Sequence, residues 1–347
     1  MRWPRSAPRD AGRADDAGAM RRRAAARTLP LSALACAHFA VPLLACASPP
    51  PVDPRHLPAA SVLEVISVLQ QHVPDDTYRF PPARDFTGRN VYRSALLRLE
   101  NLERLHEDGL RAGHLDGAIA FAKGRALERL RGYDLAADAY RLAAEREPEL
   151  SEEALRSAAL CDRLQEATAI GVDLRTQAKQ DEVWLQLAAP PVVLGRFEDR
   201  VARLEAIEND AGRTEQAFVA REEIERADVE RARYFGELRR TLPDGDVRAV
   251  AELQRVADRH AQSKNAPRHL LALADLYVDL ATEYVETHPP EGMLFDPAEF
   301  QDLVDSAARV YEMVAARDGT PEKVEASRRL EAFIAFSLTI DRERFTP

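Results

Sequence analysis

The sequence has little glycine, little cysteine and no long hydrophobic run. Glycine accounts for 15 of 347 residues, below the usual ~7%, which speaks against turn-rich all-β folds and glycine-rich nucleotide-binding loops. Three cysteines are too few for a disulfide scaffold. No apolar run reaches the ~20 residues of a membrane-spanning helix and the mean hydropathy is −0.37, so a polytopic membrane protein is excluded. The 46% of hydrophobic residues excludes a disordered chain.

Positive charge is concentrated near the N-terminus. Residues 1–45 contain eight Arg and three Asp, so the rest of the chain has a net charge of −15, against −10 for the whole chain. An apolar stretch over residues 29–45 follows an arginine cluster that begins at Arg21. This order is typical of a secretory signal peptide, which we predict over residues 1–45. Met20 directly precedes the arginine cluster and is an alternative start.

The apolar stretch ends in a short motif with its own chemistry. Residues 43–46 read Leu-Leu-Ala-Cys and resemble the lipobox of bacterial lipoproteins, in which the cysteine is diacylated and the chain is cut before it. Leu44 departs from the small residue that is usual at its place. The resemblance implies lipid attachment at Cys46. Two alternatives remain open, namely an ordinary signal peptide with a chance cysteine and a single transmembrane anchor.

A proline-rich segment follows this cysteine. Five of the residues 47–58 are proline, which favours extended polyproline II structure. We therefore predict a lipidated tether over residues 46–60. The alanine after Cys46 resembles the sorting signal of outer-membrane lipoproteins, so the expected location is the outer membrane, facing the periplasm.

From residue 61 to residue 347 the chain is rich in Ala, Leu, Glu and Arg, with apolar residues at helical spacing. This spacing predicts amphipathic helices, and signals for strands are nearly absent. The predicted fold class is all-α. One predicted helix face comprises Val91, Leu96, Leu99, Leu102, Leu105 and Leu110.

Residues 117–150 hold the clearest internal pattern. Small, aromatic and helix-ending residues recur there at fixed spacing: Gly124, Ala136, Tyr140, Ala143 and Pro148. The pattern resembles the tetratricopeptide repeat (TPR), a helix–turn–helix of 34 residues. The resemblance implies a solenoid of helix hairpins in which first-helix residues line a binding face. Phe121 and Arg125 are the candidates for that face.

A second, less regular match lies in residues 267–318. Ala274 and Tyr277 have the spacing of a first helix, and Ala307 and Tyr311 that of a second, with residues 288–300 expected as a loop inserted between them. Just before it, residues 260–266 resemble the helix junctions of periplasmic repeat lipoproteins, although His260 stands where those proteins have Tyr-Pro.

Residues 195–240 are crowded with charge. An apolar stripe from Phe197 through Leu204 and Ile207 continues imperfectly past Gly212 through Phe218. We interpret the region as a long surface helix or helix pair with Glu–Arg pairs on its solvated side. The alternative is a coiled-coil helix that forms an oligomer, but heptads are not kept for long.

Motifs that carry catalytic chemistry are not found. The eight histidines show no zinc spacing, and no acidic pair stands out from 58 carboxylates. Cys161 lies on an apolar helix face and is expected to be a buried small hydrophobe. The net charge of −15 argues against nucleic-acid binding. We therefore expect no metal, no cofactor and no enzymatic activity.

One segment combines aromatic residues and arginines between two predicted helices. Residues 73–88 contain Tyr78, Phe80 and Phe86, a composition frequent in binding hot spots. Burial of these rings against the first helices is the alternative interpretation.

The leading hypothesis is a lipid-anchored periplasmic scaffold that binds an unknown protein or peptide in envelope assembly or secretion. The alternatives are an envelope enzyme or solute-binding subunit with its pocket at residues 73–88, and a structural spacer that oligomerises through residues 195–240.

Overall fold

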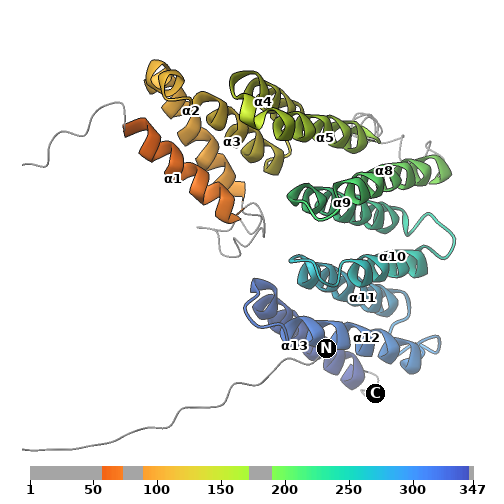
Figure 1. The fold of residues 1–347 in the computed structure, drawn as a ribbon. Coiled ribbons are helices and arrows are strands. Elements are labelled where there is room, and N and C mark those ends of the chain that lie inside the picture. Colours follow the sequence, from red (N-terminus) through yellow and green to blue (C-terminus); the bar gives the residue numbers. More distant parts are fainter. Residues whose placement is uncertain (1–56, 73–88, 172–189, 344–347) are drawn as a thin grey trace, which may run out of the picture. The chain divides into compact units, whose positions relative to one another are not determined.

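The computed structural model describes residues 57–72, 89–171 and 190–343, and these are helical with no strand among them. Figure 1 labels the helices along the chain. Their bounds are α1 Leu57–His72, α2 Arg89–Ala112, α3 Asp116–Arg129, α4 Tyr133–Arg146, the 3₁₀ helix η1 Pro148–Leu150, α5 Ser151–Ala169, α8 Pro190–Ala211, α9 Glu215–Leu238, α10 Gly245–Arg259, α11 Ala266–Thr287, α12 Pro297–Ala315 and α13 Pro321–Glu343. The all-α prediction is confirmed for these ranges.

Several predicted features lie outside the described residues. They are the signal peptide over residues 1–45, Cys46, most of the tether, and the segment 73–88 with Tyr78, Phe80 and Phe86. Helix α1 begins at Leu57, inside the stretch predicted as tether. Pro58 is compatible with this start, because a proline in the first helical turn gives up no intrahelical hydrogen bond. No helix in the described ranges is long and apolar enough to cross a membrane.

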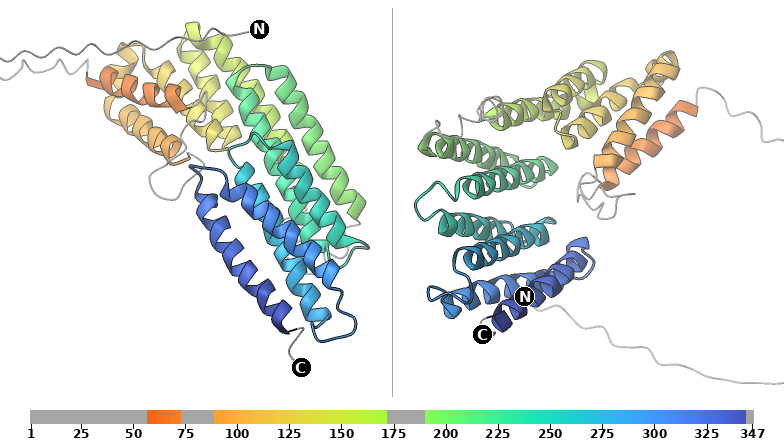
Figure 2. Two further views of the ribbon diagram at one scale, coloured as in Figure 1. Left: turned by 90° about the horizontal axis from the view of Figure 1, so that it is seen from below. Right: turned by 180° about the vertical axis from the view of Figure 1, so that it is seen from behind.

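Each described helix packs mainly on a helix that directly precedes or follows it in the chain, and Figures 1 and 2 show these neighbours side by side. A few pairs of second neighbours also touch, including α1 with α3 and α11 with α13. All described helices belong to one compact unit. Most buried contacts are therefore made between helices that are close in sequence, as expected where each helix hairpin buries its apolar face on the next.

A glycine of α3, Gly124, allows α3 and α4 to pack closely against each other. A Cβ placed on Gly124 would lie 2.7 Å from the ring of Tyr140, so only glycine permits this approach. Ala136, Tyr140 and Ala143 are completely buried in the same core. Helix α4 ends at Arg146, and Glu147 takes an extended conformation before Pro148, which begins η1. A residue before proline is driven away from helical geometry, which explains this end.

Helix α2 differs from its predicted apolar face. Leu99 and Leu110 are buried, but Leu105 is 66% exposed, whereas Tyr92 and Ala95 are buried without having been predicted. The backbone of His106 leaves helical geometry. Leu105 lies six residues after the buried Leu99, which places it off the buried face. The predicted face was therefore wrong at Leu105 and right at Leu110, beyond His106.

The charged region forms two helices, α8 and α9, joined at Gly212 with φ +61. Leu204 and Ile207 are buried as the apolar stripe requires, but Phe218 is exposed and lies under the guanidinium of Arg221. The predicted helix pair is present, and α9 has Glu–Arg pairs, since Arg226 binds Glu222 and Glu223. The prediction that these charges are solvated is wrong for several acids of α9, which are buried. Glu223, Glu225 and Asp228 are among the buried charged residues.

The C-terminal hairpin uses a shorter loop than expected. Helix α12 begins at Pro297, so residues 297–300 of the predicted loop are helical. The side chain of Asp296 caps this helix by accepting a hydrogen bond of 2.9 Å from the backbone N–H of Ala298. Phe295 is buried between Tyr284 and Phe300. An aromatic contact therefore holds the loop against the hairpin.

Candidate interaction site

The most extensive polar network of the described residues is centred on α9. Glu223, which is 1% exposed, accepts hydrogen bonds from Arg131 Nε at 2.7 Å and Arg131 Nη2 at 2.9 Å. It also accepts bonds from the Tyr133 hydroxyl at 2.7 Å and from Arg226 at 2.6 Å. Burial raises the pKa of Glu223, but Arg226 and Arg131 outweigh that effect and hold the pKa below its usual value. The carboxylate therefore joins α9 to the turn between α3 and α4.

Two histidines bind the next acids along α9. His260 Nε2 lies 2.8 Å from Asp228 Oδ2, and His269 Nε2 lies 2.5 Å from Glu225 Oε1. Ser263 donates a second hydrogen bond to Glu225 at 2.7 Å. His260, Ser263 and His269 lie at and just after the junction of α10 and α11. The junction is thus held to α9 by hydrogen bonds rather than by apolar packing alone.

These histidines do not form a metal site. Their rings lie 6.2 Å apart, and each of them is already bound to a carboxylate. No group of three or more potential metal ligands occurs among the residues that the structure describes. The network on α9 therefore holds helices together and is not a surface open to binding.

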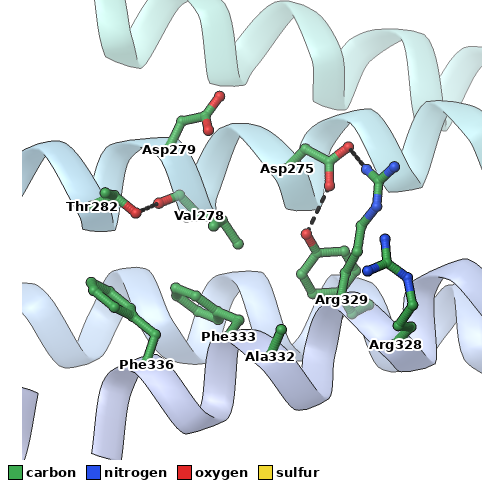
Figure 3. A pocket seen from close by; sticks show the side chains of 10 residues that line it. Asp275, Val278, Asp279, Thr282, Arg328, Arg329, Ala332, Phe333 and Phe336 are labelled. Atoms are coloured by element: carbon green, nitrogen blue, oxygen red, sulfur yellow. Dashed lines mark hydrogen bonds and ion pairs between the residues drawn. The ribbon is translucent and has the colours of Figure 1, made fainter. Parts of the chain in front are cut away.

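A groove between α11 and α13 is the candidate for such a surface. It has a volume of about 550 Å³, within the roughly 300–1,000 Å³ typical of ligand sites. Figure 3 shows Phe333 and Phe336 rising from α13 toward Val278 on α11. Phe333 is buried and Phe336 is half-buried. The groove thus has an aromatic wall in which the ring of Phe336 is open to solvent.

One end of the groove is closed by an ion pair. Asp275 on α11 binds Arg329 on α13 and accepts a hydrogen bond of 2.7 Å from the Tyr311 hydroxyl of α12. Arg329 also binds Glu325 at 2.7 Å. Burial, together with this hydrogen bond to Asp275, raises the pKa of Tyr311. The three C-terminal helices are therefore joined at this end by groups that satisfy one another.

Asp279 is different from the other charged side chains that line the groove. It is exposed, and it makes no hydrogen bond or ion pair with any described residue. In Figure 3 its carboxylate points away from the pair of Asp275 and Arg329 and away from α13. Partial burial raises its pKa; Arg239 opposes that shift, and Asp275 and Glu283 add to it. A cation beside Asp279 would relieve this unfavourable environment.

A second hollow of about 250 Å³ lies where α2, α3 and α4 meet. Its central acid, Glu103, binds Lys123 at 2.9 Å and Arg146 at 3.3 Å. Burial raises the pKa of Glu103, but the hydrogen bonds and charges of Lys123 and Arg146 outweigh burial and lower the pKa below its usual value. Because this acid is already neutralised within the fold, the hollow offers less to a partner than the groove does.

The residues predicted to form a binding face lie in the packing between helices. The ring of Phe121 meets Tyr140 edge-on at 5.2 Å, and the guanidinium of Arg125 lies over Phe121 at 5.3 Å. Arg125 also donates a hydrogen bond to Glu153 of α5 at 3.2 Å. Neither residue lines either hollow.

Cys161 lies in the same core and is completely buried. Burial, reinforced by Glu128, raises the pKa of its thiol, and its Sγ lies 3.8 Å from Glu128 Oε2. The prediction that Cys161 is buried is confirmed, but its polar neighbour Glu128 was not expected from the sequence.

The residues of the groove were missed at the level of sequence. A weak signal was present, because Asp275, Asp279 and Glu283 repeat every four residues on α11 and Phe333 and Phe336 are three apart on α13. Such spacings place residues on one face of a helix but do not show which other helix that face packs against.

Comparison with known proteins finds no matching family model, no matching curated protein and no matching solved structure.

Proposed function

We propose that the chain is a lipid-anchored scaffold of the bacterial cell envelope, acylated on Cys46, whose TPR-like helix hairpins bind a protein partner. The lipobox-like residues 43–46 and the proline-rich stretch after them support the anchor. The approach of Gly124 to Tyr140 and the neighbour-to-neighbour packing of the helices support the TPR-like character.

The observation that carries the binding function is the groove between α11 and α13. Its aromatic wall and its exposed Asp279 lie within one opening of about 550 Å³. Apolar area with a few placed polar groups is the usual composition of a binding site. A partner segment seated there would contact three helices at once, since Tyr311 of α12 also lines the groove.

Site-specific crosslinking tests this function. A photoreactive residue replaces Ala332, which lines the groove and is exposed, in cells that express the full chain. The matched control carries it at Ala335, which is exposed on the same helix and does not line the groove. We expect discrete adducts from position 332 and none of them from position 335. Identical adducts from both positions, or none from either, would contradict binding in the groove.

The anchor is tested separately by the intact mass of the mature N-terminus. Wild-type chain is expected to begin at Cys46 and to carry acyl chains, whereas the Cys46→Ala chain is expected to stay uncut or to leave the membrane fraction. An unlipidated wild-type chain that begins elsewhere would overturn the anchor and leave the proposed binding groove standing.

A further inference from the structure

The groove between α11 and α13 has a charge pattern that selects its occupant. Resting on the proposed binding function, we infer that the groove takes a basic amphipathic segment of a partner protein. In that segment a Lys or Arg would bind Asp279, and a large apolar side chain would pack on Phe336 and Val278.

The first step of the argument is the row of acids on α11. Asp275, Asp279 and Glu283 are spaced by four residues and therefore share one face of the helix. Asp275 binds Arg329, and Glu283 binds both Arg239 and Arg240, the latter at 2.7 Å. The outer two acids are thus neutralised by arginines of other helices or turns, while the central acid, Asp279, has no such partner among the described residues.

The second step is that no cation of the groove is available to Asp279. Arg328 binds Glu325 at 2.8 Å and Arg329 binds both Glu325 and Asp275. These pairs hold the pKa of Glu325 at about 2. Since the arginines are satisfied by acids, the surplus charge of the opening is the negative charge of Asp279. A cationic side chain complements it and an acidic one is repelled.

The third step is the apolar wall. Phe336 and Val278 are half-buried and Ala332 is exposed, so the groove keeps apolar surface in contact with water. Burial of that surface favours a bulky apolar side chain. A purely basic peptide would leave this wall uncovered, and a purely apolar one would bury Asp279 without a partner, which is costly. Both features are therefore required of one occupant.

The test is selection from a random peptide library displayed on phage, with the full chain as purified from expressing cells for the target. We expect the enriched peptides to combine Lys or Arg with Leu, Ile or Phe. Binding of the best peptide, measured by fluorescence anisotropy, should weaken roughly fivefold in Asp279→Asn, the scale of a partly exposed ion pair. It should also weaken as salt is raised.

Two further variants sharpen the result. Asp279→Lys should enrich acidic peptides from the same library. Glu286→Gln changes an exposed acid of α11 that does not line the groove and should leave binding unchanged. Neutral or acidic peptides enriched by the wild-type chain, with binding lost in Phe336→Ala but kept in Asp279→Asn, would overturn this inference and leave the proposed function intact. No enrichment of any peptide would overturn both.

Discussion

Replacing Glu223 by Gln should destabilise the contact between α9 and the turn of α3 and α4. The carboxylate accepts four hydrogen bonds, two of them from Arg131, one from Tyr133 and one from Arg226. Gln keeps one acceptor oxygen but turns an NH₂ group toward the guanidinium groups. Breaking one side of a buried ion pair typically costs 3–5 kcal/mol. Arg131 and Arg226 are each about a third exposed, and water therefore reduces the expected loss to about 2–3 kcal/mol.

The assay is urea unfolding followed by circular dichroism, together with hydrogen exchange. Arrays of helix hairpins need not unfold in one step, so exchange locates the loss, which we expect in α9 and around Arg131. The control is Glu237→Gln, which changes an exposed acid on the same helix. If Glu223→Gln stays within about 0.5 kcal/mol of wild type, as is usual for surface substitutions, the reasoning from the buried network is refuted.

Three further predictions concern other parts of the fold. Gly124→Ala should lower the melting temperature, because the added Cβ would lie 2.7 Å from the ring of Tyr140. Gly195→Ala is the control: Gly195 lies inside α8 with open space around it, so this substitution should raise the free energy of unfolding by roughly 0.5–1 kcal/mol. Equal shifts of the melting temperature for both variants would contradict the packing argument. The pKa of Asp228 is lowered, since burial is outweighed by its hydrogen bond with His260 and by the nearby arginines, so its contribution to stability is present above its ordinary pKa and lost as pH falls below it. The Asp228→Asn chain should therefore lose less stability than wild type between about pH 5 and pH 3 in acid titrations, and parallel curves would contradict this. Cys161 is buried and its thiol pKa is raised, so it should resist alkylation in the native chain and react in denaturant. Peptide mapping by mass spectrometry would measure this, and rapid labelling of Cys161 in the native chain would contradict its burial.

Local features of the sequence were sufficient to predict that the chain is helical and that α3 packs on α4. Helix α4 ends where Pro148 requires, and the repeat-like pattern placed a small residue at Gly124, where the structure brings the ring of Tyr140 against α3. Both depend on residues within one hairpin, where helical periodicity relates position in sequence directly to position in space. The same reasoning was wrong for Leu105, which was assigned to the buried face although it lies six residues after Leu99 and is exposed.

The helical class, the approximate positions of the hairpins, and the N-terminal pattern from which the lipid anchor is proposed can all be derived from the sequence alone. The burial of the acids of α9, their hydrogen bonds with His260 and His269, and the groove that Asp279, Phe333 and Phe336 line together became visible only in the folded chain. The physical reason is distance along the chain. Arg131 and Glu223 are 92 residues apart, and no local period relates a charge to a partner on a helix several elements away.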